Sequence, residues 1–216
     1  MINPVEYSQP WLIVVEGVLD KIFFEKFLRF RNICGFEVHD PKDILLDDDR
    51  GGKDCFGECL EASKTQSALK GVLLVSDNDS DPSTSFRAVQ SQIRKAELTE
   101  PSAPLSVTEQ TNAPKVVVMM LPWTDETGCL ESLCLPAAYA KWPGLNEPLN
   151  NYLIASPART WQVSPQSKML FRCLTAAGCE RDPNAGIRVL YKPGCEFPLD
   201  HACFDRMATY LAGLQT

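Results

Sequence analysis

The sequence predicts an α/β fold of the Rossmann-like kind, a mostly parallel sheet with helices on both faces and a C-terminal helical extension. Apolar, partly β-branched runs at residues 11–16, 71–76 and 115–121 are typical of strands buried on both faces. Amphipathic segments separate these runs, and this alternation favours parallel strands joined by right-handed crossovers. We expect an α/β core over residues 1–140 and an extension over 141–216 packed on the same domain.

Local patterns predict the remaining elements. Helical periodicity indicates helices at 18–30, 53–64, 86–98, 129–139 and 167–177, and a final helix capped by residues 198–201. Further short strands are expected at 35–39 and 187–191. Segments rich in Pro, Ser, Thr or Asn are expected to lack regular structure, with a mobile surface loop at 99–114 and an irregular stretch at 142–165.

The composition is that of a globular protein without a membrane span. Hydrophobic residues make up 44% of the 216 residues and charged residues 23%, and no apolar run is long enough to cross a bilayer. The first residues lack the pattern of a secretory signal, so we expect a cytoplasmic protein. Nine scattered cysteines without a C-x-x-C pair, and only two histidines, predict reduced thiols in the core instead of a zinc site.

The charge is unevenly distributed. The net charge is −7, and the acid excess lies in the first 150 residues, whereas residues 151–216 carry a small basic excess. Non-specific binding of duplex DNA needs a basic surface, so this charge balance argues against tight non-specific binding of duplex DNA. Contacts to nucleic acid are therefore expected from the C-terminal third.

Acidic residues follow each of the main predicted strands. Glu16 ends the first run, Asp77 and Asp79 follow the second, and Glu131 opens the helix after the third. Asp20 lies one helical turn after Glu16. Parallel strands deliver their carboxyl ends to one edge of the sheet, where sites of such folds lie. Carboxylates without histidine or paired cysteine suit Mg²⁺ or Mn²⁺, ions that proteins use on phosphates.

Structural interpretations of the same acids stay open. Asp77 and Asp79 also suit a turn before Pro82. Asp20 and Glu131 also suit the first turn of a helix, where the helix dipole favours an anion.

These motifs carry a family resemblance. Val15-Glu16-Gly17 after a strand, and Asp77-x-Asp79 after a later strand, resemble the Toprim domain of topoisomerases, bacterial primases, recombination proteins and OLD-family (overcoming lysogenization defect) nucleases. Asp20 one turn after Glu16, and Gly128-Cys-Leu-Glu131 after the next strand, are similar to the OLD-type branch. Leu121-Pro122 with Gly128…Glu131, and the segment 197–204, are most similar to a small stand-alone bacterial Toprim-related family.

The resemblance implies roles for the acids. Glu16 would act as general acid/base or metal ligand, and Asp77 and Asp79 would hold Mg²⁺ (or Mn²⁺). Asp20 and Glu131 would complete a second ion position.

It also implies a catalytic lysine in the C-terminal part. Lys168 is the candidate, with Arg172 one helical turn later, although Lys168 equally suits a solvated helix position. The chain has no G-x-x-x-x-G-K-[ST] motif of an ATPase, so the resemblance implies a Toprim module alone or paired with another chain, such as an ATPase.

The expected function is metal-dependent cleavage of phosphodiester bonds in nucleic acid, DNA or RNA, by a nuclease-like enzyme. The alternative is a non-catalytic Toprim-fold protein that binds metal or nucleic acid, or regulates a partner protein. Primer synthesis is a more distant candidate. No membrane partner is expected.

Overall fold

The computed structural model describes residues 7–180, 183–184, 186–191 and 196–214. Its strands form one sheet with the order β2-β1-β3-β4, and each neighbouring pair is parallel. The strands are β1 (Trp11–Val14), β2 (Phe36–His39), β3 (Gly71–Asp77) and β4 (Lys115–Leu121). The predicted parallel α/β architecture is therefore confirmed.

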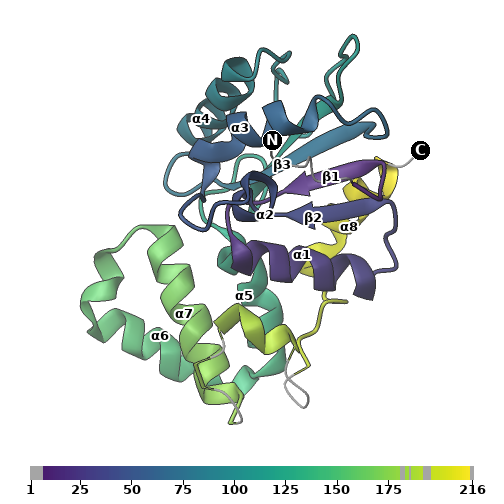
Figure 1. Ribbon diagram of the computed structural model, residues 1–216. Helices are drawn as coiled ribbons and strands as arrows, with labels where there is room; N and C mark the ends of the chain where they lie inside the picture. The colour runs from purple at the N-terminus through teal and green to yellow at the C-terminus, as the bar shows by residue number, and fades with distance from the viewer. Residues whose placement is uncertain (1–6, 181–182, 185, 192–195, 215–216) are drawn as a thin grey trace.

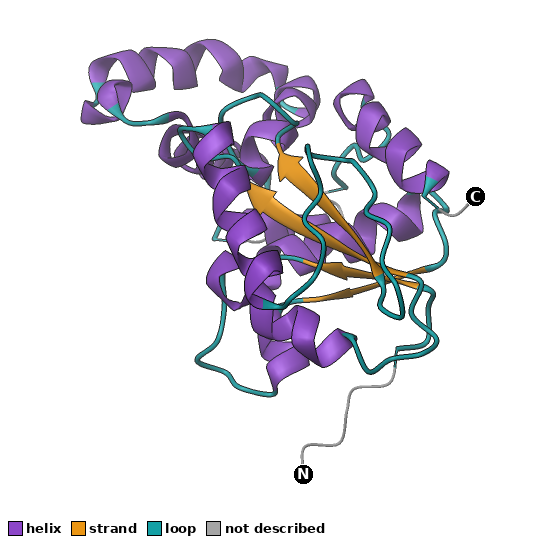
Figure 2. Ribbon diagram, turned by 90° about the horizontal axis from the view of Figure 1, so that it is seen from above, coloured by secondary structure: helices purple, strands orange, loops and turns teal. Residues whose placement is uncertain are grey.

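Helices cover both faces of this sheet (Figure 1). The α-helices are α1 (Val18–Phe30), α2 (Pro41–Leu45), α3 (Phe56–Ser63), α4 (Pro82–Lys95), α5 (Leu130–Lys141), α6 (Asn146–Ala155), α7 (Val163–Gly178) and α8 (Asp205–Gly213). Short 3₁₀ turns are η1 (Lys53–Cys55), η2 (Pro143–Leu145), η3 (Pro157–Thr160), η4 (Gly186–Tyr191) and η5 (Ala202–Phe204). Figure 2 shows the strands running side by side between the helical layers.

Each strand divides its side chains between two buried clusters. Ile13, Leu73 and Val117 point into one cluster, under α1, α5, α7 and α8. Their sequence neighbours, Leu12 among them, point into the other cluster, under α2, α3 and α4. Successive side chains of a strand point to opposite faces, so a strand that is apolar at every position requires a helical layer on both sides.

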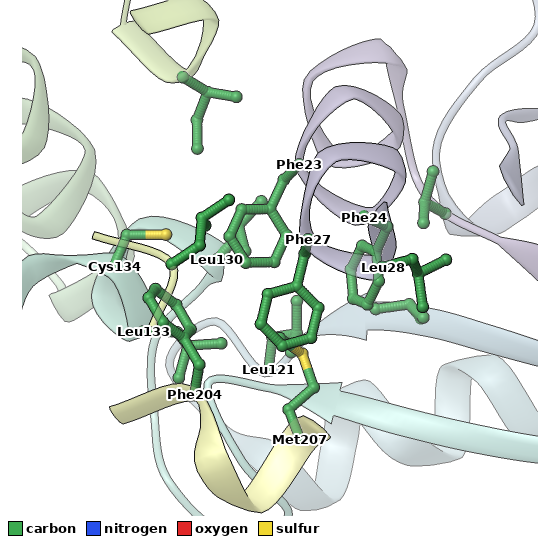
Figure 3. Packing of buried hydrophobic residues seen from close by; sticks show 14 of the residues in the cluster. Phe23, Phe24, Phe27, Leu28, Leu121, Leu130, Leu133, Cys134, Phe204 and Met207 are labelled. Atoms are coloured by element: carbon green, nitrogen blue, oxygen red, sulfur yellow. The ribbon is translucent and has the colours of Figure 1, made fainter. Parts of the chain in front are cut away.

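The first cluster reaches the C-terminal extension. Phe204 packs on Phe23 and Phe27 of α1, with ring centroids 5.8 Å apart in each case (Figure 3). Met207 and Leu211 of α8 are buried in the same cluster. The chain after residue 196 therefore completes the core face that the strands begin.

Several predicted boundaries change for reasons visible in the structure. Helix α4 begins at Pro82 instead of Phe86, because Asp81 caps it by accepting hydrogen bonds from the backbone N–H groups of Ser83 and Thr84. The same signal marks α2, which the sequence interpretation missed. Asp40 caps it, Pro41 is its first residue, and Asp43 completes a capping box.

The prediction of an irregular stretch at 142–165 is wrong. Helix α6 lies within it, and α7 begins four residues earlier than expected. Leu149, Tyr152 and Leu153 of α6 have helical spacing, but no residue of α6 is buried, and its Pro and Asn residues favoured the prediction of an irregular stretch.

The predicted strand at 187–191 is also wrong, because this segment is the 3₁₀ turn η4. Ile187 is buried among the side chains of the first cluster. It packs on helices there and pairs with none of the described strands.

The segment 99–114 has no regular structure, as expected, but it is held along the sheet. The backbone N–H groups of Leu105 and Thr108 donate to the carbonyl groups of Val118 and Val116, at 2.8 and 3.1 Å. This contact covers the outer edge of β4, which protects an edge strand from pairing with other chains.

Within the described ranges, no helix combines the length and the apolar composition that crossing a membrane requires.

Seven of the described cysteines are free thiols, whereas Cys179 is disulfide-bonded, so the expectation of reduced thiols does not hold at every position.

Candidate functional site

Glu16, two residues after the end of β1, forms hydrogen bonds with residues at the end of β3. One carboxylate oxygen of Glu16, Oε1, accepts hydrogen bonds from the Ser76 hydroxyl at 2.6 Å and from the Asp77 backbone N–H at 3.0 Å. The two strands are parallel neighbours, so their carboxyl ends meet here, as the sequence predicts. These bonds fix the orientation of the Glu16 side chain.

Asp77 connects this edge to two helices. Its Oδ1 accepts a hydrogen bond from the backbone N–H of Leu130, the first residue of α5, at 3.0 Å. The N–H groups of a first helical turn have no partner within the helix, so a carboxylate placed there is stabilised. Its Oδ2 lies 3.6 Å from the ammonium of Lys168 on α7.

Four acids, Glu16, Asp20, Asp77 and Glu131, line one pocket of about 440 Å³, which we call the acidic pocket. Glu16 and Asp77 come from the strand ends, and Asp20 and Glu131 come from the first turns of α1 and α5. Further lining residues are Gly17, Leu19, Gly52, Lys168 and Arg172. The structure therefore brings together five of the six predicted site residues.

The crowding of carboxylates changes their acidity. Burial, followed by the charges of Glu16 and Glu131, raises the pKa of Asp20 to about 7 from its ordinary 3.8. Burial, followed by the charges of Asp20 and Glu16, also raises the pKa of Asp77 well above its ordinary value. Like charges that share a site disfavour the ionised form, so the pocket favours either protons or a cation.

Lys168 is the cation that the chain itself supplies. Burial alone would lower the pKa of Lys168, but the charges of Asp77 and Glu131 outweigh burial and raise it. A hydrogen bond between α5 and α7 helps to position Lys168. The Ser132 hydroxyl donates to the hydroxyl of Ser167, the residue before Lys168, at 2.8 Å. α7 is thereby held against the start of α5.

The sixth predicted residue, Asp79, lies beside the pocket and is not among its lining residues. Its backbone is left-handed, with φ 52°, and pairs in both directions with Gly128 at 2.8 Å. Its side chain is directed to Lys53, with 3.3 Å between Oδ2 and Nζ. Asp77 and Asp79 therefore face different partners in this conformation, because the chain leaves β3 after Asp77 and takes a left-handed backbone at Asp79.

The donor set fits a hard divalent cation by its chemistry. Its four acids offer only oxygen atoms, and their mutual repulsion would be relieved by positive charge. As the side chains stand, no three acidic, histidine or cysteine residues within the described ranges form a group that could hold a metal ion. Mg²⁺ commonly uses one or two carboxylates and several waters, so a complete protein shell is not required.

Sequence reasoning missed two residues next to the site. Ser76, which holds Glu16, is the one hydroxyl residue in an otherwise apolar strand, and that signal was readable. Lys53, the partner of Asp79, follows a Gly-Gly loop and carries no comparable signal.

Comparison with known proteins gives a family for the chain. The family model described as "Protein of unknown function (DUF3226)" matches residues 10–185. The chain belongs to this family. The matched span runs from the start of β1 past α7, so it includes every lining residue of the acidic pocket. Searches of curated proteins and of solved structures found no match.

Proposed function

We propose that this protein is a Mg²⁺- or Mn²⁺-dependent enzyme that cleaves phosphodiester bonds of nucleic acid, built on a Toprim-like fold of the OLD type. The observation that supports this proposal is the pocket at the carboxyl edge of the sheet. It gathers four carboxylates and one lysine from two strand ends and three helices.

The residues of the pocket suit complementary tasks. A bound divalent ion would neutralise phosphate charge, activate water and stabilise the leaving oxygen. Glu16 and Asp77 are oriented by hydrogen bonds and are the first ligand candidates. Asp20 and Glu131 line the same pocket and would complete a second ion position. The ammonium of Lys168 can stabilise negative charge on a phosphate.

Cleavage assays with matched variants test this function. Single-stranded, duplex and supercoiled substrates are incubated with Mg²⁺ or Mn²⁺ and wild type, Glu16→Gln, Asp77→Asn or Glu147→Gln. We expect the first two changes to lower the rate by roughly 10²–10⁴-fold, because general acid–base and charge effects of single groups have this size. Glu147 is exposed on α6, so its change is the control and should leave the rate unaltered.

Absence of cleavage on all these substrates would contradict the enzymatic proposal. The same holds for cleavage that survives both Glu16→Gln and Asp77→Asn.

One observation favours the non-catalytic alternative, a Toprim-fold protein that binds nucleic acid or a partner protein. The ammonium of Lys168 lies 3.6 Å from Asp77, so the chain can offset part of its acid cluster without a metal ion. Thermal unfolding in a Mg²⁺ titration separates the two candidates. Stabilisation of wild type that is lost in Asp77→Asn, without cleavage, supports the binding protein. Stabilisation together with cleavage supports the enzyme.

A further inference from the structure

A second cavity, of about 320 Å³, adjoins the acidic pocket. The two share three lining residues, Leu19, Glu131 and Arg172. The second cavity is formed by the start of α1, the starts of α5 and η4, and the middle of α7. A substrate whose reacting bond lies in the acidic pocket therefore has its neighbouring group in this cavity.

One part of the lining is cationic. Arg172 and Arg188 both border the cavity. Within the described ranges neither guanidinium has a carboxylate at ion-pair distance. By contrast, Arg31 is bound to Asp205 at 2.9 Å. Guanidinium groups present paired donors that match phosphate oxygens, so this part of the cavity suits a phosphate group.

Another part of the lining is apolar. Val18 is 48% exposed, although it lies at the first position of α1. Leu19, which is partly exposed, borders the same cavity, whereas Phe171 and Ile187, which also border it, are almost fully buried. An exposed apolar surface beside cationic groups matches a ligand with an anionic end and a flat, weakly polar end, which is the character of a nucleotide.

The size limits what the cavity can hold. Small-molecule sites are roughly 300–1,000 Å³, so a cavity of about 320 Å³ accommodates one nucleotide and no longer segment. The net charge of −7 disfavours extended electrostatic binding to duplex nucleic acid, so recognition of a single nucleotide is consistent with the composition.

We infer that this cavity is a subsite for a single nucleotide unit of the substrate, with its phosphate on Arg188 and Arg172 and its base or sugar against Val18 and Leu19. The inference rests on the proposed function, because it places the scissile bond in the acidic pocket. It narrows the substrate to nucleic acid that offers an unpaired nucleotide next to the cleaved bond.

Binding of a nucleoside 5′-monophosphate tests the subsite without requiring turnover. Titration calorimetry in one Mg²⁺-containing buffer compares the monophosphate with its nucleoside, using wild type, Arg188→Gln, Arg29→Gln and Glu16→Gln. Arg29 is also exposed, near the far end of α1, and serves as the control. We expect about tenfold weaker binding in Arg188→Gln, no change in Arg29→Gln, and little affinity for the nucleoside.

Equal affinities in Arg188→Gln and Arg29→Gln would overturn the subsite, as would equal binding of nucleoside and monophosphate. Glu16→Gln should keep the Arg188-dependent binding while it loses cleavage. If no variant and no substrate shows cleavage but binding still depends on Arg188, the proposed catalysis fails and the nucleotide subsite stands.

Discussion

On one face of the sheet, Ile13 and Leu73 pack beneath α1, α5, α7 and α8, whereas on the other face Leu12 and Val72 pack beneath α2, α3 and α4. Both layers are buried to a similar degree, with Phe23 and Phe56 each fully excluded from solvent. The first layer, made of α1, α5, α7 and α8, nevertheless supplies all the charged helix residues that line the acidic pocket, namely Asp20, Glu131, Lys168 and Arg172. The loops beside the second layer contribute Gly52 to the lining and, next to the pocket, the ion pair of Lys53 and Asp79.

The difference lies in how each layer uses the acids at its helix starts. On the second face, Asp40 and Asp81 cap α2 and α4, so their oxygens are bonded to backbone N–H groups of their own helices. On the first face, α1 begins after Gly17 without a side-chain cap, and Asp20 lines the pocket. The N-cap acids of the second face therefore stabilise their own helices, whereas Asp20, at the third position of α1, contributes to the site on the first face.

Removing one buried ring from each layer should have the largest effect on stability. Phe204→Ala and Phe56→Ala both delete a ring that is fully buried, and each should lower the free energy of unfolding by about 3–5 kcal/mol in urea titrations. Only Phe204 packs on Phe23 and Phe27 of α1, the helix that carries Asp20. Nucleotide binding without denaturant should therefore weaken in Phe204→Ala and not in Phe56→Ala. Equal effects on binding would show that the two faces support the site equally.

The pH dependence of stability should report on Asp20. Burial and the charges of Glu16 and Glu131 raise its pKa to about 7, whereas the unfolded chain releases the proton near pH 4. Between these values the folded protein holds a proton that the unfolded chain has lost. The free energy of unfolding should therefore fall as pH rises from about 4 to 7, by roughly 2–4 kcal/mol.

Asp20→Asn should reduce that slope, measured by urea unfolding in EDTA at pH 5 and pH 7.5, and the remaining slope should come from Asp77, whose pKa is also raised. Asp125→Asn alters an exposed acid after β4 and should keep the slope. If the free energy of unfolding of Asp20→Asn changes with pH as much as that of the wild type, Asp20 is not the titrating group.

Replacing Lys168, inside the acidic pocket, or Lys53, beside it, should have the smallest effect on stability. Lys168 lies 3.6 Å from Asp77 in the pocket, and Lys53 lies 3.3 Å from Asp79 beside it. Both ion pairs are partly exposed, so either Lys→Gln change should cost about 1 kcal/mol or less in unfolding. Cleavage should fall by about tenfold or more in Lys168→Gln and less than twofold in Lys53→Gln. Similar cleavage rates in the two variants would remove Lys168 from the site.

The sequence predicted the parts of the molecule that depend on local pattern. Strands such as Lys115–Leu121 were recognised at their observed boundaries, because an apolar β-branched run is both a strand signal and a burial signal. Glu16 and Asp77 were placed correctly because parallel strands must end at a common edge. α6 was missed because its Pro and Asn residues outweighed the helical spacing of Leu149 and Leu153.

What the sequence determined by itself was the layered α/β fold and the presence of acids at its strand ends, because side-chain periodicity and strand direction are local properties. Only the tertiary structure decided which acids meet. It turned Asp79 toward Lys53 through a left-handed backbone bonded to Gly128. It brought Lys168, 91 positions after Asp77, to that carboxylate through the packing of α7 on α5. Such choices depend on contacts between segments far apart in the chain, and no local pattern encodes them.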